Sequence, residues 1–189
     1  MSVGSLLRSS YLLYFSQPAG DRALFQAISK QPIRSIVEIG LELAGRTERM
    51  LEVISWNGTT EPVRYTGIDL FDARSKPQSP LSLKQAFATL KKPQSGLHLN
   101  LRLVPGDPAT ALARAANSLA ATDLLVISAN HDEQSLARAW SWMPRMLTPQ
   151  SLVLVEAPGT KVGSSTWRKL SLPEIHQLAA KEQSKRRAA

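Results

Sequence analysis

Acidic residues and glycines follow two apolar runs of the chain, and their chemistry suits a nucleotide pocket. The first run, SIVEIG, contains Glu38 and ends at Gly40, and the second, VRYTGIDL, carries Asp69 near its end. Glycine permits the tight turn where a backbone approaches a ligand closely. A carboxylate at the end of the neighbouring strand is suited to accept hydrogen bonds from ligand hydroxyl groups. The two runs together predict a nucleotide-binding pocket.

Two further groups of polar residues follow apolar runs later in the chain. Gly106 and Asp107 come after LHLNLRLVP, and Ser128 and His131 come after or near the end of DLLVIS. Asp107 precedes Pro108, so it is equally explained as the N-cap of a helix. His131 could act as a general base that takes a proton from a hydroxyl substrate. A histidine in a surface loop without such a role is the alternative interpretation.

Apolar runs alternate along the chain with segments of helical periodicity. We expect strands at 35–40, 63–70, 97–104, 123–128 and 151–156, and helices at 21–30, 44–56, 82–90, 108–120 and 132–147. Ser82 and Gln85 predict a capping box at the start of the third of these helices, and Pro144 should kink or shorten the last one. The alternation predicts an α/β fold: a Rossmann-like, doubly wound, mainly parallel sheet with helices on both faces.

In such a sheet the carboxyl ends of the strands lie at one edge, where ligands bind. The sequence divides into a helical lead-in at 1–32, a Rossmann-like core at 33–158, and a short C-terminal extension with a basic tail at 159–189. Within the extension, STWRKL is a candidate strand and PEIHQLAAKEQ a candidate helix.

Composition excludes several kinds of site. The 189 residues include no cysteine, which excludes disulfides and thiolate chemistry. Three scattered histidines argue against a histidine-rich metal site. No apolar run approaches the ~20 residues of a membrane helix, so a cytoplasmic protein is expected. Part of the net charge of +8 comes from the basic tail. The tail is expected to be a solvated segment rather than a nucleic-acid contact, because it lacks interleaved aromatic residues.

From about Ile33 to Glu156 the chain resembles the class I S-adenosylmethionine-dependent methyltransferases. EIGLELAG resembles their first glycine motif, GIDLF their second strand end, and LVPGDPATAL their third. The segment from DLLVIS to SLVLVE is similar to that of small O-methyltransferases.

The resemblance implies S-adenosylmethionine as the cofactor and assigns roles to particular residues. Glu38 and Gly40 would line its methionine end, Asp69 would bind the ribose hydroxyls, and Asp107 would accept from the adenine amino group. The implied cofactor-binding residues are Glu38, Gly40, Leu41, Asp69, Leu70, Gly106, Asp107 and Ser128, and the candidate catalytic residue is His131.

The sequence also departs from the family pattern. Glu42 and Ala44 stand where the second and third glycines of the first motif usually are. Ser128 stands where metal-dependent O-methyltransferases place a carboxylate, so no metal is expected.

Three hypotheses follow. The leading one is a methyltransferase-like protein that transfers a methyl group from S-adenosylmethionine to a small-molecule acceptor. The second is a catalytically inactive relative that serves for binding or scaffolding. The third is a nicotinamide-nucleotide binder, which the absence of G-x-G-x-x-G disfavours.

Overall fold

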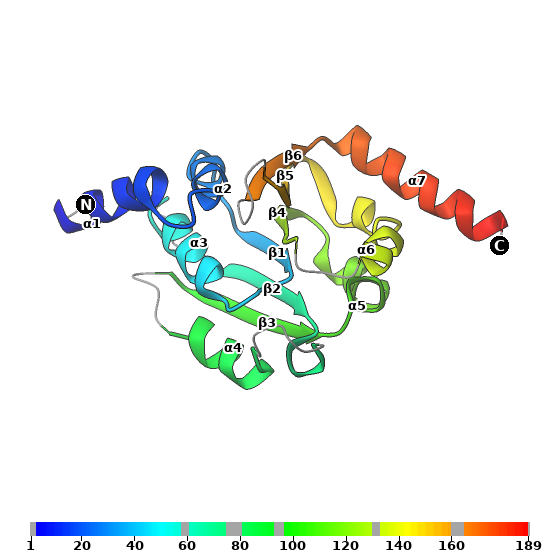
Figure 1. Cartoon of the computed structure of the whole chain (residues 1–189), viewed down its shortest axis with the longest axis horizontal. Helices are drawn as coiled ribbons and strands as arrows, with labels where there is room; N and C mark the ends of the chain where they lie inside the picture. The colour runs from blue at the N-terminus through cyan, green and yellow to red at the C-terminus, as the bar shows by residue number, and fades with distance from the viewer. Residues whose placement is uncertain are drawn as a thin grey trace.

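In the computed structural model, the described residues are 3–57, 61–74, 81–92, 97–129, 133–159 and 165–188. Within them a six-stranded sheet has the order β3-β2-β1-β4-β5-β6 (Figure 1). The strands are β1 (Ser35–Ile39), β2 (Val63–Asp69), β3 (Leu99–Pro105), β4 (Thr122–Ile127), β5 (Leu147–Pro158) and β6 (Ser165–Leu170). The first five strands are parallel, and β6 pairs antiparallel with β5. The mainly parallel Rossmann-like sheet expected from the sequence is confirmed.

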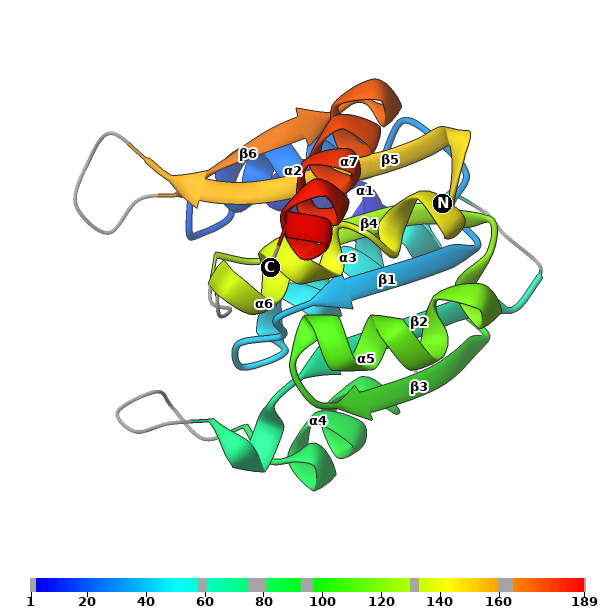
Figure 2. The same cartoon turned by 90° about the vertical axis from the view of Figure 1, so that its right-hand side faces the viewer.

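Helices cover both faces of this sheet (Figures 1 and 2). One face carries α2 (Asp21–Ile28), α3 (Gly45–Ser55) and α4 (Leu83–Leu90), and the other carries α5 (Pro108–Ala115), α6 (Glu133–Ala139) and α7 (Leu172–Ala188). Each face buries its own apolar cluster, the first including Phe25 and Met50 and the second Leu112 and Met143. Strands buried on both faces explain why the strand sequences read as continuous apolar runs.

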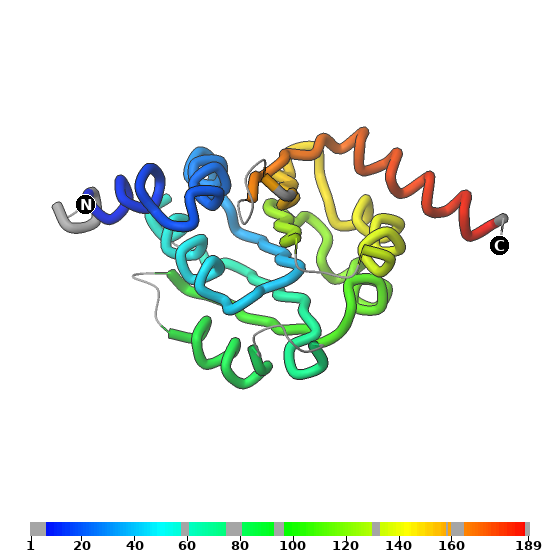
Figure 3. The backbone as a smooth tube through the Cα atoms, in the orientation of Figure 1, coloured from blue at the N-terminus to red at the C-terminus, as the bar shows by residue number. Residues whose placement is uncertain are grey.

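The chain ends lie far apart. The N-terminal helix α1 (Val3–Ser10), followed by a π-helical turn at Tyr11–Phe15, projects at one end of the molecule, and α7 projects at the other (Figure 3). None of the helices in the described ranges is both long enough and apolar enough to span a membrane.

Local sequence signals explain where several helices begin. The Ser82 hydroxyl accepts from the Gln85 N–H while the Gln85 side chain accepts from the Ser82 N–H, which is the predicted capping box of α4. Asp107 caps α5, with Pro108 at the first helical position. These predictions are confirmed because a cap depends on residues only two or three positions apart.

The helix predicted at 132–147 is shortened, as expected from Pro144 within that range. Helix α6 ends at Ala139, and a short 3₁₀ turn follows at Met143–Arg145, containing Pro144. Proline removes a backbone donor and clashes with the preceding helical turn, so the helix cannot continue through it. Strand β5 then begins at Leu147, earlier than the strand expected at 151–156.

Candidate functional site

The loop after β1 keeps a left-handed backbone at three positions. The φ angles are 83° at Gly40, 51° at Glu42 and 63° at Ala44. Left-handed backbone is unfavourable for residues with a β-carbon and persists only where the surroundings hold it. Two of the three residues are not glycines, so the loop has the backbone conformation of a glycine-rich loop although Glu42 and Ala44 carry side chains. Such strained loops concentrate at ligand sites.

Asp69, at the end of β2, lies directly beside this loop. Its Oδ2 accepts a hydrogen bond from the Leu41 N–H at 2.7 Å, and its Oδ1 accepts from the Phe71 N–H at 2.9 Å. The residue is only 7% exposed. The parallel register of β1 and β2 brings the two strand ends together, as the sequence predicted.

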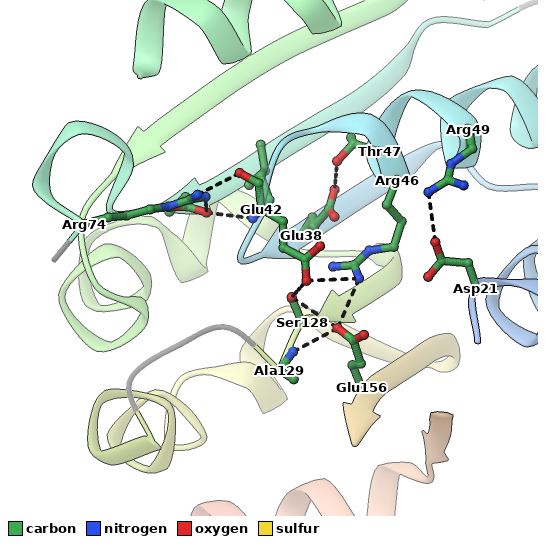
Figure 4. A network of polar contacts seen from close by, with 12 residues as sticks. Asp21, Glu38, Glu42, Arg46, Thr47, Arg49, Arg74, Ser128, Ala129 and Glu156 are labelled. Atoms are coloured by element: carbon green, nitrogen blue, oxygen red, sulfur yellow. Dashed lines mark hydrogen bonds and ion pairs between the residues drawn. The ribbon is translucent and has the colours of Figure 1, made fainter. Parts of the chain in front are cut away.

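Arg74 occupies the remaining face of the Asp69 carboxylate. Its Nε donates to Oδ1 at 2.7 Å and its Nη2 to Oδ2 at 2.5 Å, a bidentate pair buried on both sides. Its Nη1 donates to the carbonyl oxygen of Glu42 at 2.7 Å, which ties the pair to the strained loop (Figure 4). Both oxygens of Asp69 are therefore engaged within the chain.

Glu38 points into the protein rather than into a cleft. It has no exposed surface, and its Oε2 accepts from the Thr47 hydroxyl at 2.8 Å and from the Tyr65 hydroxyl at 2.6 Å. Its Oε1 has no hydrogen-bond partner within the described ranges. Burial raises the pKa of Glu38, while the Arg46 cation and the two hydroxyls oppose the rise.

A buried arginine joins the strand ends on the other side of β1. The Nη1 of Arg46 lies 3.1 Å from Oε2 of Glu156 and 3.6 Å from Oε1 of Glu42. The face of its guanidinium stacks on Trp167, 5.0 Å from the ring centroid. Burial works against the charge of Arg46, but the surrounding carboxylates hold its pKa above its ordinary value. The result is a charged cluster that links β5, β6 and the start of α3 (Figure 4).

Glu156 fixes the end of β4 within the same cluster. Its Oε2 accepts from the Ala129 N–H at 3.0 Å and from the Ser128 hydroxyl at 3.3 Å, and Ser128 also donates to Glu42 at 3.3 Å. Burial works to raise the pKa of Glu156, but Arg46 and the Ala129 N–H hold that pKa below its ordinary value. Glu156 is therefore a carboxylate held in its ionised form.

The third strand end is tied to the second. Gly106 has φ 139°, and its N–H donates to the carbonyl oxygen of Asp69 at 2.9 Å. Asp107 accepts from the Ala109 and Thr110 N–H groups at 3.1 Å and from the Ser135 hydroxyl at 2.5 Å. Slight burial opposes ionisation, but these donors outweigh it and lower the pKa of Asp107 to about 2.

The structure thus brings most of the predicted site residues to one edge of the sheet. Leu41 and Ser128 are fully buried, whereas Leu70 is 36% exposed. His131 lies outside the described residues. No group of three acidic, histidine or cysteine side chains among the residues described could hold a metal ion.

Sequence reasoning missed Arg46, Arg74 and Glu156 as members of the site. The two arginines carried a signal in their spacing from an acid, since Arg46 follows Glu42 by four residues and Arg74 follows Asp69 by five. Glu156 is the last residue of the run SLVLVE, so it was an acid at a strand end like Asp69. Its partner Arg46 is 110 residues away in the sequence, and only the sheet order brings the two together.

Comparisons with known proteins identify the fold. The chain matches no protein-family model, and no curated protein matches it in sequence. Many solved structures are similar to it in fold, and three of them are methyltransferases that illustrate the similarity. A TehB-like SAM-dependent methyltransferase from Corynebacterium glutamicum ATCC 13032 Kitasato has a TM-score of 0.51 at 13% identity, over 95% of this chain and 80% of that one.

The other two are also methyltransferases. A TDP-rhamnose 3'-O-methyltransferase of calicheamicin biosynthesis has a TM-score of 0.53 at 18% identity, over 82% of this chain and 76% of that one. The N-methyltransferase NodS from Bradyrhizobium japonicum WM9 has a TM-score of 0.51 at 14% identity, over 87% of this chain and 83% of that one. The chain spans 36% of the length of the larger methyltransferase MycE, at a TM-score of 0.42. The chain has the Rossmann-like fold of class I S-adenosylmethionine-dependent methyltransferases, so the expected resemblance is confirmed for the fold.

Proposed function

We propose that this chain binds S-adenosylmethionine at the carboxyl edge of its sheet and transfers the methyl group to a small-molecule acceptor. One observation carries the proposal: the left-handed loop after β1 lies against the acid that ends β2. The Leu41 N–H to Asp69 Oδ2 bond at 2.7 Å records that contact. The edge lies at the strand ends of a doubly wound sheet, where such folds bind nucleotides.

The residues present fit such a cofactor in three respects. The loop at 40–44 keeps the backbone course of a glycine loop. A β-carbon built on Gly106 would meet nothing within 4 Å, which leaves space beside the third strand end. The carboxylates of Glu42 and Glu156 make the neighbourhood suitable for a sulfonium cation.

We assign the ribose hydroxyls to Asp69, where they compete with Arg74 for the carboxylate oxygens. A ribose can take the Asp69 oxygens only when Arg74 releases at least one of them, because each oxygen already accepts two hydrogen bonds. We assign the methionine end of the cofactor to Gly40, and its adenine to Leu70, Gly106 and Asp107. Glu38, Leu41 and Ser128, which the resemblance also implied as cofactor-binding residues, have no exposed surface, so we assign them a supporting role behind the site in place of direct contact.

S-adenosylmethionine would supply an electrophilic methyl carbon; the acceptor nucleophile bonds to it, and the sulfur keeps the electrons of the broken carbon–sulfur bond. The chain must then position the acceptor and take its proton. His131 is our candidate for that base. In this proposal 33–158 is the cofactor-binding core, flanked by the lead-in at 1–32 and the extension at 159–189, and the protein acts in the cytoplasm.

Titration calorimetry tests the proposal, with S-adenosylmethionine and S-adenosylhomocysteine injected into the folded protein. Binding by wild type that weakens in Asp69→Asn is expected, because the amide offers the ribose one acceptor in place of two. Absence of heat from either ligand at millimolar concentration would end the proposal. Binding without methyl transfer to any acceptor would favour the inactive alternative, and tight binding of NADH in their place would favour a nicotinamide site.

A further inference from the structure

A cavity of about 420 Å³ lies beside the charged cluster, away from Asp69. It is lined by the start of α2, the loop after β1, the start of α3, the end of β5 and the start of β6. The charged residues in its wall are Asp21, Glu42, Arg46, Arg49 and Glu156. In the sheet order, β1 and β4 separate β5 from β2, so the cavity lies on the opposite flank of the loop from the proposed ribose position.

Arg46 lies in the wall of this cavity and has a buried edge that makes no hydrogen bond. Its Nη1 pairs with Glu156 and its face stacks on Trp167, but its Nε and Nη2 are buried without a hydrogen-bond partner in the described part of the chain. A buried donor without a hydrogen-bond partner lowers the stability of the folded state, and more so where the donor is charged. A ligand that supplies acceptors to this edge would remove that penalty.

Two other arginines show what such an edge binds in this protein. Arg8 uses Nε and Nη2 to hold both oxygens of Glu52, at 2.9 and 3.0 Å. Arg74 uses the same two atoms to hold both oxygens of Asp69. The fork of a guanidinium matches a carboxylate in this bidentate way. The unpartnered Nε and Nη2 of Arg46, a residue in the wall of the cavity, are therefore the pair of donors that suits a carboxylate.

Asp21 supplies the complementary feature. It is 1% exposed, its Oδ2 pairs with Nη2 of Arg49 at 3.0 Å, and its Oδ1 is buried without a partner among the described residues. Burial raises the pKa of Asp21, while the cations of Arg46 and Arg49 oppose the rise. The free oxygen accepts a hydrogen bond from an ammonium or another charged donor. The cavity thus pairs a free donor edge with a free acceptor.

We infer that this cavity is the acceptor site and that it takes a small amino carboxylate, with the carboxylate on Arg46 and the amino group toward Asp21. The charges in the wall favour a zwitterion. A simple anion would meet the carboxylates of Asp21, Glu42 and Glu156, and a simple cation would meet Arg46 and Arg49. The name "acceptor site" rests on the proposed function, whereas the binding of an amino carboxylate does not.

Ligand-observed NMR tests the inference on the full chain, with and without saturating S-adenosylhomocysteine. The probes are glycine, β-alanine, 4-aminobutyrate and the standard L-amino acids, each matched by a carboxylate and an amine that lack the second group. At least one amino carboxylate should bind, and its two matched fragments should bind roughly tenfold more weakly or not at all. No binding by any amino carboxylate at millimolar concentration overturns the inference.

Variants of Arg46 test directly whether its guanidinium binds the carboxylate of the ligand. Arg46→Gln removes the fork, and Arg46→Lys keeps the charge beside Glu156 without it, so both should weaken the bound amino carboxylate by about tenfold or more. Arg8→Gln is the matched control, because Arg8 makes the same bidentate pair at an exposed position away from the cavity. Circular dichroism confirms that each variant is folded. Equal affinity in wild type and in folded Arg46→Lys would contradict the inference.

The aminocarboxylate tail of the methyl donor is the competing occupant, and 5'-methylthioadenosine, which lacks that tail, distinguishes it. If Arg46→Lys weakens S-adenosylhomocysteine but not 5'-methylthioadenosine, the edge holds the donor and the acceptor assignment is wrong. If wild type binds an amino carboxylate through Arg46 but no S-adenosylhomocysteine, the proposed function fails while the binding site stands.

Discussion

Arg74 holds both carboxylate oxygens of Asp69, the acid at the end of β2, through a side-on bidentate pair with each residue about 95% buried at the side chain. The same arginine donates to the carbonyl oxygen of Glu42 at 2.7 Å. The sequence predicts Asp69 as a hydrogen-bond acceptor for a ligand, so a ligand must compete with Arg74 for the Asp69 oxygens.

Replacing Arg74 by Gln should tighten the binding of S-adenosylhomocysteine by roughly three- to tenfold, because the ribose no longer has to displace a charged donor. The folded state should lose about 3–5 kcal/mol, because Asp69 is left as a buried charge with only its two backbone donors. Calorimetry measures the affinity, and urea unfolding measures the free energy of unfolding.

Arg34→Gln is the control for this variant, since its pair with Glu61 is exposed on both sides. It should change stability by less than about 1 kcal/mol and leave the affinity unchanged. Weaker binding in Arg74→Gln than in wild type would show that Arg74 helps to hold the ligand and does not compete with it.

The raised pKa of Glu38 predicts a pH dependence of stability. An acid whose pKa is higher in the folded state than its unfolded value of about 4.3 binds more protons when folded, in the window between the two. Stability contributed by the neutral form is therefore present below the unfolded pKa and is lost as the pH rises through the folded pKa. Burial is the main cause of the raised value.

Glu38→Gln removes this titration. The free energy of unfolding of the variant, relative to wild type, should rise between pH 4 and pH 8 by an amount on the order of 1 kcal/mol. Urea unfolding at a series of pH values measures it, with the exposed Glu61 changed to Gln as the control for loss of a carboxylate. A difference that falls with rising pH would contradict the buried, partly unpartnered position of Glu38.

Asp107 should give stability a pH dependence opposite to that of Glu38, because its pKa is lowered in the folded state. Its pKa of about 2 lies below the unfolded value of about 3.9, so its stabilisation is present above pH 4 and is lost as the pH falls toward 2. Because the side chain is partly exposed, solvent screening limits the effect to about 1–2 kcal/mol.

Asp107→Asn and Asp107→Ala separate the charge from the helix cap. Asparagine still caps α5, so the first variant should lose mainly the pH dependence between pH 2 and 5, while alanine should also lose about 1 kcal/mol at neutral pH. Thermal unfolding at pH 2.5, 4 and 7 measures both effects. Equal stability of the two variants at pH 7 would show that the cap contributes nothing.

The left-handed backbone at Ala44 predicts a stabilising substitution. Ala44→Gly relieves the strain at φ 63°, which costs roughly 1–2 kcal/mol for a residue with a β-carbon, although glycine also loses more entropy on folding. The net gain should be about 0.5–1 kcal/mol by urea unfolding. Ala113→Gly, at an exposed position inside α5, is the matched control and should destabilise by about 1 kcal/mol.

Several features could be predicted because the signals are local. Alternating apolar runs and helical patterns predicted the strands and helices, and Ser82 and Asp107 marked helix starts correctly. The helix expected at 132–147 is shortened, as Pro144 indicated, whereas β5 begins earlier than the strand expected at 151–156. Leu147 pairs with Thr122 of β4, a contact distant in sequence, and this pairing starts β5 before the apolar run at 151–156.

The sequence by itself determined the fold class and the edge of the sheet where Gly40, Asp69 and Asp107 meet, because strand direction places all carboxyl ends of a parallel sheet together. Only the tertiary structure decided how those side chains are used. Arg74 engages Asp69, Glu38 turns into the core, and Arg46 reaches Glu156 across 110 residues of sequence. Ion pairs and burial depend on which elements become neighbours, and periodicity along the chain carries no information about that.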